Sequence, residues 1–292
     1  SKYTLEDIIQ RKTKHDRRMM EAVSGLNWPL TSVFEVAPLR AGSVLLYSHN
    51  TFHRGNHRRD DWRQWTENPR FMWRFWIYRT NEPSGTDSGE VDWCKESVDP
   101  LTGFDLTEVS SGIKSTWRYH KHWLETGKPP SPKIDDTIQS NEYLKKQALQ
   151  LFGQMLEKGD EKEPIRIGAA YELAAIRDQV LAKELLRKAL LNERESVRRA
   201  GTYGLIALGT AAEDVFLEAI ESPIKWMRKA GVYGLGEVST LNQEIFDAVK
   251  GCLLEDASKY VRSVAAGSLG CLGRRTIASG QGLEWIPKCI EV

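Results

Sequence analysis

The 292-residue chain lacks several features that would assign it to a class at once. No run of about 18 apolar residues occurs, which excludes a conventional membrane-spanning helix. There is no glycine-rich phosphate loop, no Gly-x-Ser-x-Gly elbow and no Cys–His nucleophile pair. The 41 Lys+Arg and 40 Asp+Glu leave a net charge of +1, which removes the simplest argument for a nucleic-acid binder.

Cysteine is also scarce, and its spacing excludes the usual metal motifs. Cys94, Cys252, Cys271 and Cys289 form no Cys-x-x-Cys pair, so scattered reduced thiols are expected. Residues 1–20 are charged throughout and do not read as a secretory signal. We therefore expect an intracellular protein, in the cytoplasm or in an organelle lumen that keeps thiols reduced.

Composition is uneven along the chain. All six histidines and eight of the ten tryptophans lie within residues 1–123. Residues 1–80 carry 14 Lys+Arg and 8 Asp+Glu, a balance of +6, which leaves −5 for residues 81–292. At roughly 150 residues per domain, this asymmetry indicates two domains of different kinds.

The second half contains an internal repeat. Four segments align without gaps around arginines 32, 30 and 34 residues apart, each with an apolar residue before it and a leucine seven after it: 165–173, 197–205, 227–235 and 261–269. A seven-residue step returns to nearly the same helix face, and the small residues between permit close helix packing. The pattern predicts helices there, with partner helices around 180–186, 215–220 and 245–249.

These repeats resemble HEAT repeats of the short kind also found in phycobilin lyases. The resemblance implies an α-solenoid over about residues 140–275 that binds a protein partner or neighbouring subunits. For the repeated Arg166, Arg198, Arg228 and Arg262 we favour a structural role, solvated or bonded to a neighbouring repeat; a row that reads a substrate is the alternative. The tail, residues 276–292, departs from the pattern and is expected to cap the last repeat.

The first third favours β-structure after an initial helix over residues 4–23. Residues 32–36 and 71–78 predict strands, and residues 41–49 predict a turn followed by a strand, because β-branched and aromatic residues favour β-structure. A polar, basic loop with His53 lies between the last two. Gly127 and the prolines that follow mark a domain boundary, and the tryptophans before it are expected to pack on the β domain or on the first repeat.

Three stretches in this region carry a family resemblance: Gly42–Tyr47, then His53-Arg54-Gly55-Asn56, then Asn68-Pro69-Arg70 followed by Phe71-Met72-Trp73. They are similar to the C-terminal part of the phytanoyl-CoA dioxygenase family, Fe(II)- and 2-oxoglutarate-dependent oxygenases on a double-stranded β-helix. The resemblance gives His53 the role of an iron ligand. It gives Arg70, with Arg74 as second choice, the role of binding 2-oxoglutarate, and it implies C–H hydroxylation with release of succinate.

The upstream ligand pair of that family, His-x-Asp or His-x-Glu, occurs nowhere in the sequence. The printed chain therefore supplies one iron ligand. Two explanations stay open: the remaining ligands precede Ser1 in a longer protein, or the metal site has degenerated.

Other candidate sites are weaker. His53 and His57 have the spacing of a two-histidine zinc site, but Gly55 and the polar context favour a loop. His120 and His122 imitate a chelating pair in a segment that reads as helix, where residues two apart point to different sides. The basic, aromatic residues 54–79 could suggest single-stranded nucleic acid, although a sheet core explains the aromatic residues better.

These observations combine into an α+β multidomain protein: a partial double-stranded β-helix (jelly-roll) followed by an α-solenoid of HEAT-like helix pairs. The expected divisions are residues 1–126, a proline-rich linker over 127–139 and the solenoid over 140–292. The leading function is a dioxygenase-like protein with a HEAT-repeat docking module, whose activity needs upstream metal ligands. The alternative is a catalytically inactive scaffold or assembly subunit.

Overall fold

A computed structural model describes residues 42–45, 83, 96–98, 103, 105–107, 109–130, 141–159, 162–280 and 282–292. The chain forms two compact units, Ser1–Ile77 and Tyr78–Val292. Of the first unit, residues 42–45 are described: they form a turn at Gly42 and irregular structure, with Val44 and Leu45 exposed.

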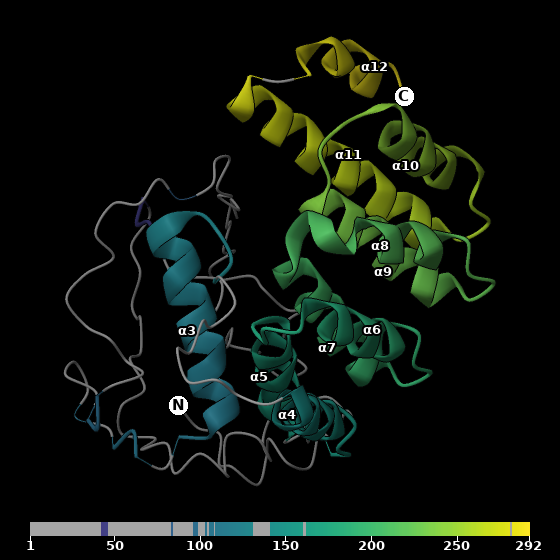
Figure 1. The fold of residues 1–292 in the computed structure, drawn as a ribbon. Coiled ribbons are helices and arrows are strands. Elements are labelled where there is room, and N and C mark those ends of the chain that lie inside the picture. Colours follow the sequence, from purple (N-terminus) through teal and green to yellow (C-terminus); the bar gives the residue numbers. More distant parts are fainter. Residues whose placement is uncertain are drawn as a thin grey trace, which may run out of the picture. The chain divides into compact units, whose positions relative to one another are not determined.

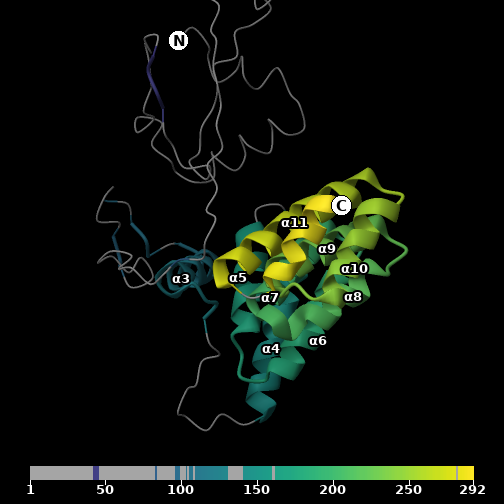
Figure 2. The same cartoon turned by 90° about the horizontal axis from the view of Figure 1, so that it is seen from above.

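The described residues of the second unit are mostly helical. The first helix described is α3 (Ser111–Thr126), whose N-cap Ser110 accepts a hydrogen bond from the Ile113 N–H and which ends at Gly127 in the left-handed conformation. The following helices alternate between two layers (Figures 1 and 2). The first layer, here called the motif layer, contains α5 (Glu163–Ala174), α7 (Glu195–Ala207), α9 (Lys225–Val238) and α11 (Lys259–Ser279); the second contains α4 (Asn141–Met155), α6 (Gln179–Leu190), α8 (Glu213–Ile220) and α10 (Gln243–Glu255).

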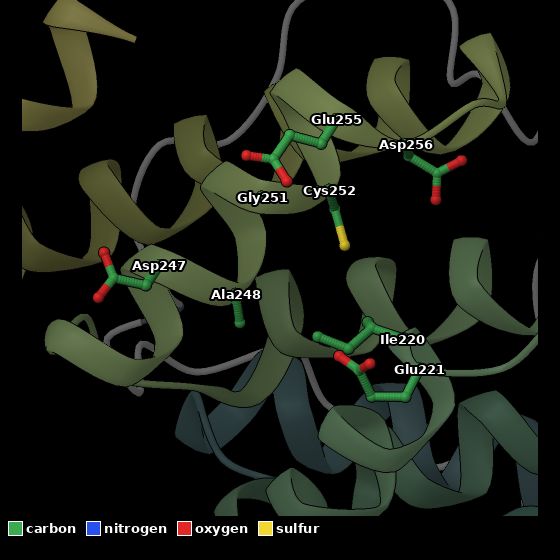
Figure 3. A pocket seen from close by; sticks show the side chains of 8 residues that line it. All are labelled: Ile220, Glu221, Asp247, Ala248, Gly251, Cys252, Glu255 and Asp256. Atoms are coloured by element: carbon green, nitrogen blue, oxygen red, sulfur yellow. The ribbon is translucent and has the colours of Figure 1, made fainter.

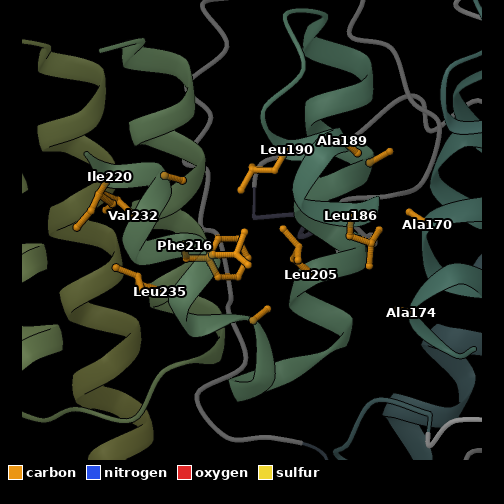
Figure 4. Packing of buried hydrophobic residues seen from close by; sticks show 14 of the residues in the cluster. Ala170, Ala174, Leu186, Ala189, Leu190, Leu205, Phe216, Ile220, Val232 and Leu235 are labelled. Carbon is orange, nitrogen blue, oxygen red and sulfur yellow. The ribbon is translucent and has the colours of Figure 1, made fainter. Parts of the chain in front are cut away.

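The predicted repeat is confirmed as the motif layer, and the predicted partner stretches are confirmed as α6, α8 and α10. The leucines seven after each arginine are buried in a continuous core: Leu173, Leu205, Leu235 and Leu269. Phe216 of α8, fully buried, lies between Leu205 of α7 and Leu235 of α9 (Figure 4). Burial of each such side chain stabilises the fold by about 1.5–3 kcal/mol. Because neighbouring helix pairs provide part of this burial, each pair depends on the next for its stability.

Glycine permits the closest helix contacts, as the sequence predicted. A Cβ on Gly168 of α5 would lie 2.3 Å from the Gly112 Cα of α3, and a Cβ on Gly234 of α9 would lie 2.2 Å from the Phe216 ring. The backbones of α3 and α5 therefore meet directly. This contact places α3 on the first repeat, one of the two positions expected for the tryptophan-containing segment before the boundary.

The C-terminal tail packs on the last repeat, which confirms the expected cap. A 3-10 turn (Leu283–Trp285) and α12 (Ile286–Glu291) follow α11. The Trp285 and Phe246 ring centroids lie 5.5 Å apart, and Trp285 and Cys289 pack on the hydrophobic core.

The prediction of an α+β multidomain fold with a partial double-stranded β-helix is wrong for the described residues. They are 75% helix and 1% strand, and they contain no β-helix or sheet. The isolated bridge between Val98 and Asp105 is the β-structure found among them. Residues 42–45, predicted as a turn that leads into a strand, form a turn at Gly42 and no strand.

Candidate functional site

The predicted oxygenase residues fall outside the described part of the chain. His53, the expected iron ligand, and Arg70 and Arg74, expected to bind 2-oxoglutarate, lie there together with His57, so these assignments stay predictions. The printed sequence has no His-x-Asp or His-x-Glu motif, the ligand pair that the resemblance implies.

The described residues contain no group of three or more His, Cys, Asp or Glu side chains that could hold a metal ion. His120 and His122 lie in α3, as predicted. The His120 ring packs edge-on to Tyr171, with the centroids 6.1 Å apart. This places His120 in the aromatic contact between α3 and α5.

The repeated arginines have a structural role. Each donates from its guanidinium to backbone carbonyls in the loop that precedes its own helix. Arg166 donates to Glu157 O and Gly159 O at 3.0 and 2.8 Å, and Arg198 to Asn192 O and Glu193 O at 2.9 and 3.1 Å. The later repeats repeat the contact: Arg228 donates to Ser222 O and Pro223 O, and Arg262 to Asp256 O.

These bonds explain why arginine recurs at this position. Carbonyls of a loop that follows a helix have no partner within that helix, and a buried carbonyl without a partner costs about 1–3 kcal/mol. One planar guanidinium satisfies two such carbonyls in the first three repeats and one in the fourth, and it joins the two helices of a pair. All four arginines bond to the loop of their own pair, and Arg228 also donates to both carboxylate oxygens of Asp256 in the loop of the next pair, at 2.7 and 3.0 Å. These bonds support the structural interpretation over a substrate-reading row.

Ion pairs link consecutive helix pairs. In the motif layer, Arg199 of α7 contacts Glu163 of α5 at 2.7 Å. In the second layer, Lys183 of α6 contacts Asp214 of α8 at 2.6 Å, and Arg187 of α6 contacts Glu218 of α8. These side chains are partly exposed, so each pair contributes about 0–1 kcal/mol and is screened by salt.

A row of tyrosines crosses the motif layer five residues after each repeated arginine: Tyr171, Tyr203 and Tyr233, with Gly267 at the same position in α11. Tyr119 of α3 stacks on Tyr171, with ring centroids 4.0 Å apart. Burial raises the pKa of Tyr171 and Tyr233 well above the ordinary value, so both phenols stay protonated at neutral pH.

A second surface lies at the first turns of α9 and α11. We call it the aromatic–lysine patch; it consists of Ile224, Lys225, Trp226, Lys229, Lys259 and Tyr260. The Trp226 and Tyr260 side chains are 40% and 49% exposed, and their ring centroids lie 5.5 Å apart. Lys225 Nζ lies 4.7 Å from the Trp226 ring centroid, and Lys259 Nζ 5.5 Å from that of Tyr260.

Our sequence reasoning missed this patch, although the repeat alignment contains its signal. Three residues before the repeated arginine, Glu163 and Glu195 give way to Lys225 and Lys259. At the next position, Pro164 and Ser196 give way to Trp226 and Tyr260. The framework positions repeat while these two change, and that contrast could have marked the surface.

An open acidic hollow of about 340 Å³ lies between α8 and α10 (Figure 3). Its carboxylates are Glu221, Asp247, Glu255 and Asp256. Hydrogen bonds from Arg228 hold the pKa of Asp256 below its usual value, despite partial desolvation. Burial, with the nearby Asp256 and Glu221 carboxylates, raises the pKa of Cys252 to about 11, so this thiol is protonated at neutral pH and a poor nucleophile.

Cys252, Cys271 and Cys289 are free thiols. Within the described ranges, none of the helices is both long and apolar enough to cross a bilayer. No protein-family model and no curated protein matches the chain.

Proposed function

We propose that the helical array is a HEAT-like α-solenoid whose motif layer docks a protein partner, so that the chain acts as a scaffold or assembly subunit. The observation that carries this proposal is that different positions of each repeat have different roles. The arginine and leucine positions recur because they build the fold, whereas neighbouring outward positions differ in every repeat.

The residue after each repeated arginine illustrates that variation. It is Ile167, Arg199, Lys229 and Ser263 in the four repeats. Arg199 and Ser263 are exposed, and Lys229 is half-buried beside Trp226. Repeat arrays present such positions side by side on an extended face, where the sequence changes freely without disturbing the stack. Exposed tyrosine and tryptophan are also the side chains most enriched in protein interfaces.

Photo-crosslinking tests this docking role. A benzoyl-phenylalanine would replace Tyr233 or Ser263 in the motif layer and, as matched controls, Glu184 or Glu244 in the second layer. All four positions are exposed. We expect the same partner protein to be crosslinked from both motif-layer positions and from neither control. Equal crosslinking from both layers, or none from the motif layer, would contradict the proposal.

A second proposal rests on the sequence resemblance alone: an Fe(II)- and 2-oxoglutarate-dependent oxygenase activity that uses His53 with Arg70 or Arg74. It requires that metal ligands outside the printed chain complete the site. Release of succinate from 2-oxoglutarate by the full-length protein with Fe(II) is the expected result, and His53→Ala should abolish it. No release and no retained iron would end this proposal, and unchanged release by the variant would end the assignment of His53.

A further inference from the structure

We infer that the aromatic–lysine patch binds an acidic, extended segment of a partner protein. This inference rests on the proposed docking function and names the chemistry of the partner. It follows from the exposed rings, the charge on the lysines and the place of both within the repeat.

The rings and lysines of the patch form one continuous surface across two helices. Trp226 and Tyr260 occupy equivalent positions in α9 and α11 and contact each other. Lys225 lies within reach of both rings, at 4.7 Å from the Trp226 centroid and 5.9 Å from that of Tyr260. Lys229 lies 5.8 Å from the Trp226 centroid on the next turn. The rings thus hold the ammonium groups close to an exposed aromatic surface.

The positive charge of the patch is not neutralised within the described residues. Lys225, Lys229 and Lys259 form no ion pair with any carboxylate that the structure describes. In the preceding repeat the corresponding cation is paired: Arg199 contacts Glu163 at 2.7 Å and Glu195 at 3.5 Å. A carboxylate supplied by a partner would therefore find charge complementarity here, on α9 and α11.

Stability of the helices does not account for the lysines. The first turn of a helix favours acidic residues, and lysine there loses about 0.3–1 kcal/mol relative to them. The first turns of α5 and α7 contain Glu163 and Glu195, whereas those of α9 and α11 contain no acid. Two repeats thus break the same local rule in the same way, at positions that share one surface, which is typical of a binding site.

The size of the patch favours a short peptide over nucleic acid. Its positive charge covers two repeats and stops at Glu195, whereas single-stranded nucleic acid needs a basic groove that follows many phosphates. Adjacent helix axes lie about 8–10 Å apart. In a polyproline II segment, side chains three residues apart point in the same direction and lie about 9 Å apart. Acidic residues at i and i+3 would therefore reach Lys225 and Lys259 together. Aromatic-lined grooves bind such segments with little loss of entropy.

Fluorescence anisotropy on the full chain tests the inference with a labelled peptide of four Glu-Pro-Pro repeats. Peptides with glutamine or lysine in place of glutamate, and a twelve-nucleotide oligo-dT, serve as competing probes. We expect the glutamate peptide to bind at least tenfold more tightly than the other three. Tighter binding of oligo-dT would assign the patch to nucleic acid instead, and no binding of the glutamate peptide would overturn the inference.

Variants locate the binding. Lys225→Glu with Lys259→Glu, which restores the residue type of the first two repeats, should weaken the glutamate peptide at least tenfold. Trp226→Ser with Tyr260→Ser should weaken it while leaving the charge unchanged. The matched control is Lys145→Glu with Lys146→Glu on α4, an equal change in charge at exposed positions away from the patch. An equal loss in this control, or unchanged binding by the first variant, would contradict the inference.

The docking function and the acidic-segment inference can be rejected separately. Crosslinking from Tyr233 and Ser263 to one partner, without glutamate-peptide binding, would retain the docking function and reject the acidic segment. Absence of both would reject both. Circular dichroism of each variant confirms that the helices are intact before binding is compared.

Discussion

The two halves of the helical array use one position of the repeat in opposite ways. In α5 and α7, the residue three before the arginine is an acid. Glu163 of α5 accepts hydrogen bonds from both Arg166 and Arg199, so its negative charge is neutralised within the protein. In α9 and α11 the same position is Lys225 or Lys259, beside an exposed ring. Because arginine and leucine hold each repeat together, the neighbouring position forms bonds within the protein in one half and contributes to an exposed surface in the other.

The largest expected difference between the halves concerns the arginines. Arg166 has a side chain that is 2% exposed and donates four hydrogen bonds, so Arg166→Ala should lower the free energy of unfolding by about 3 kcal/mol. Urea denaturation followed by circular dichroism measures the loss, and hydrogen exchange should locate it in α4 and α5.

The matched change in the second half is Arg262→Ala. Arg262 is half-buried and donates to Asp256 O at 2.7 Å, so about 1 kcal/mol is expected. Equal losses for the two arginines would show that the described bonding does not set their importance.

Glycines give the next contrast. Gly168→Ala should cost about 2 kcal/mol, because its Cβ would meet the backbone of Gly112 and push α3 away from α5. Gly267→Ala in α11 has nothing within 4 Å of the new Cβ and should stabilise its helix by up to about 1 kcal/mol. The two thermal unfolding midpoints should move in opposite directions; a loss at Gly267 would mean that this face is covered.

Asp256 makes a pH-dependent contribution confined to the second half. Arg228 hydrogen bonds lower its pKa in the folded protein below 3.8, so the stabilisation is present above that value and is lost as pH falls through the folded-state pKa. Asp256→Asn should cost about 1.5 kcal/mol at pH 7, and its difference from the parent protein should vanish at the acid end.

The control for this pH effect is Asp247→Asn, at an exposed position on the same hollow. Its difference from the parent protein at pH 7 should be small, because the Asp247 side chain is exposed. Urea titrations at several pH values provide the comparison, and parallel curves for Asp256→Asn and the parent would contradict the linkage.

The smallest expected effect on stability belongs to the patch itself. In Lys225→Glu with Lys259→Glu, favourable first-turn acids offset the lost contacts of lysine with the rings, so unfolding should change by less than about 1 kcal/mol. The reciprocal Glu195→Lys in α7 should cost about 0.5 kcal/mol and create no peptide binding, because Ser196 offers no ring. Denaturation and anisotropy on the same samples separate the two effects.

The helical half could be predicted from spacing, and the repeat alignment also marks which surface positions vary, but it does not show which side chains meet there. The recurrence of arginine and leucine locates α5, α7, α9 and α11, because period and burial are local properties of the sequence. The carbonyls that receive each arginine depend on how the preceding loop turns, which spacing does not encode. The patch arises because Trp226 and Tyr260, 34 residues apart, become neighbours when two repeats stack.

The β interpretation had a different weakness. It relied on β-branched and aromatic runs in residues 32–78 and on a resemblance that covers a small part of the chain. Strand propensity reflects packing on partner strands more than an intrinsic backbone preference. At Val44 and Leu45, where the structure describes that region, the side chains are exposed and no strand forms.

In mechanical terms, the polar contacts make each helix pair a stiff element and leave the connections between pairs more compliant. The repeated arginine fastens each helix pair within itself through partly buried bonds to its own loop. The bonds of Lys183 and Arg187 to α8 cross between pairs and are open to solvent. Dissolved salt weakens such exposed contacts and spares buried ones, so rising ionic strength loosens the joint between α6 and α8 more than the joint that Arg228 and Asp256 hold. Bending between pairs would then adjust the spacing of the docking positions while each pair keeps its shape.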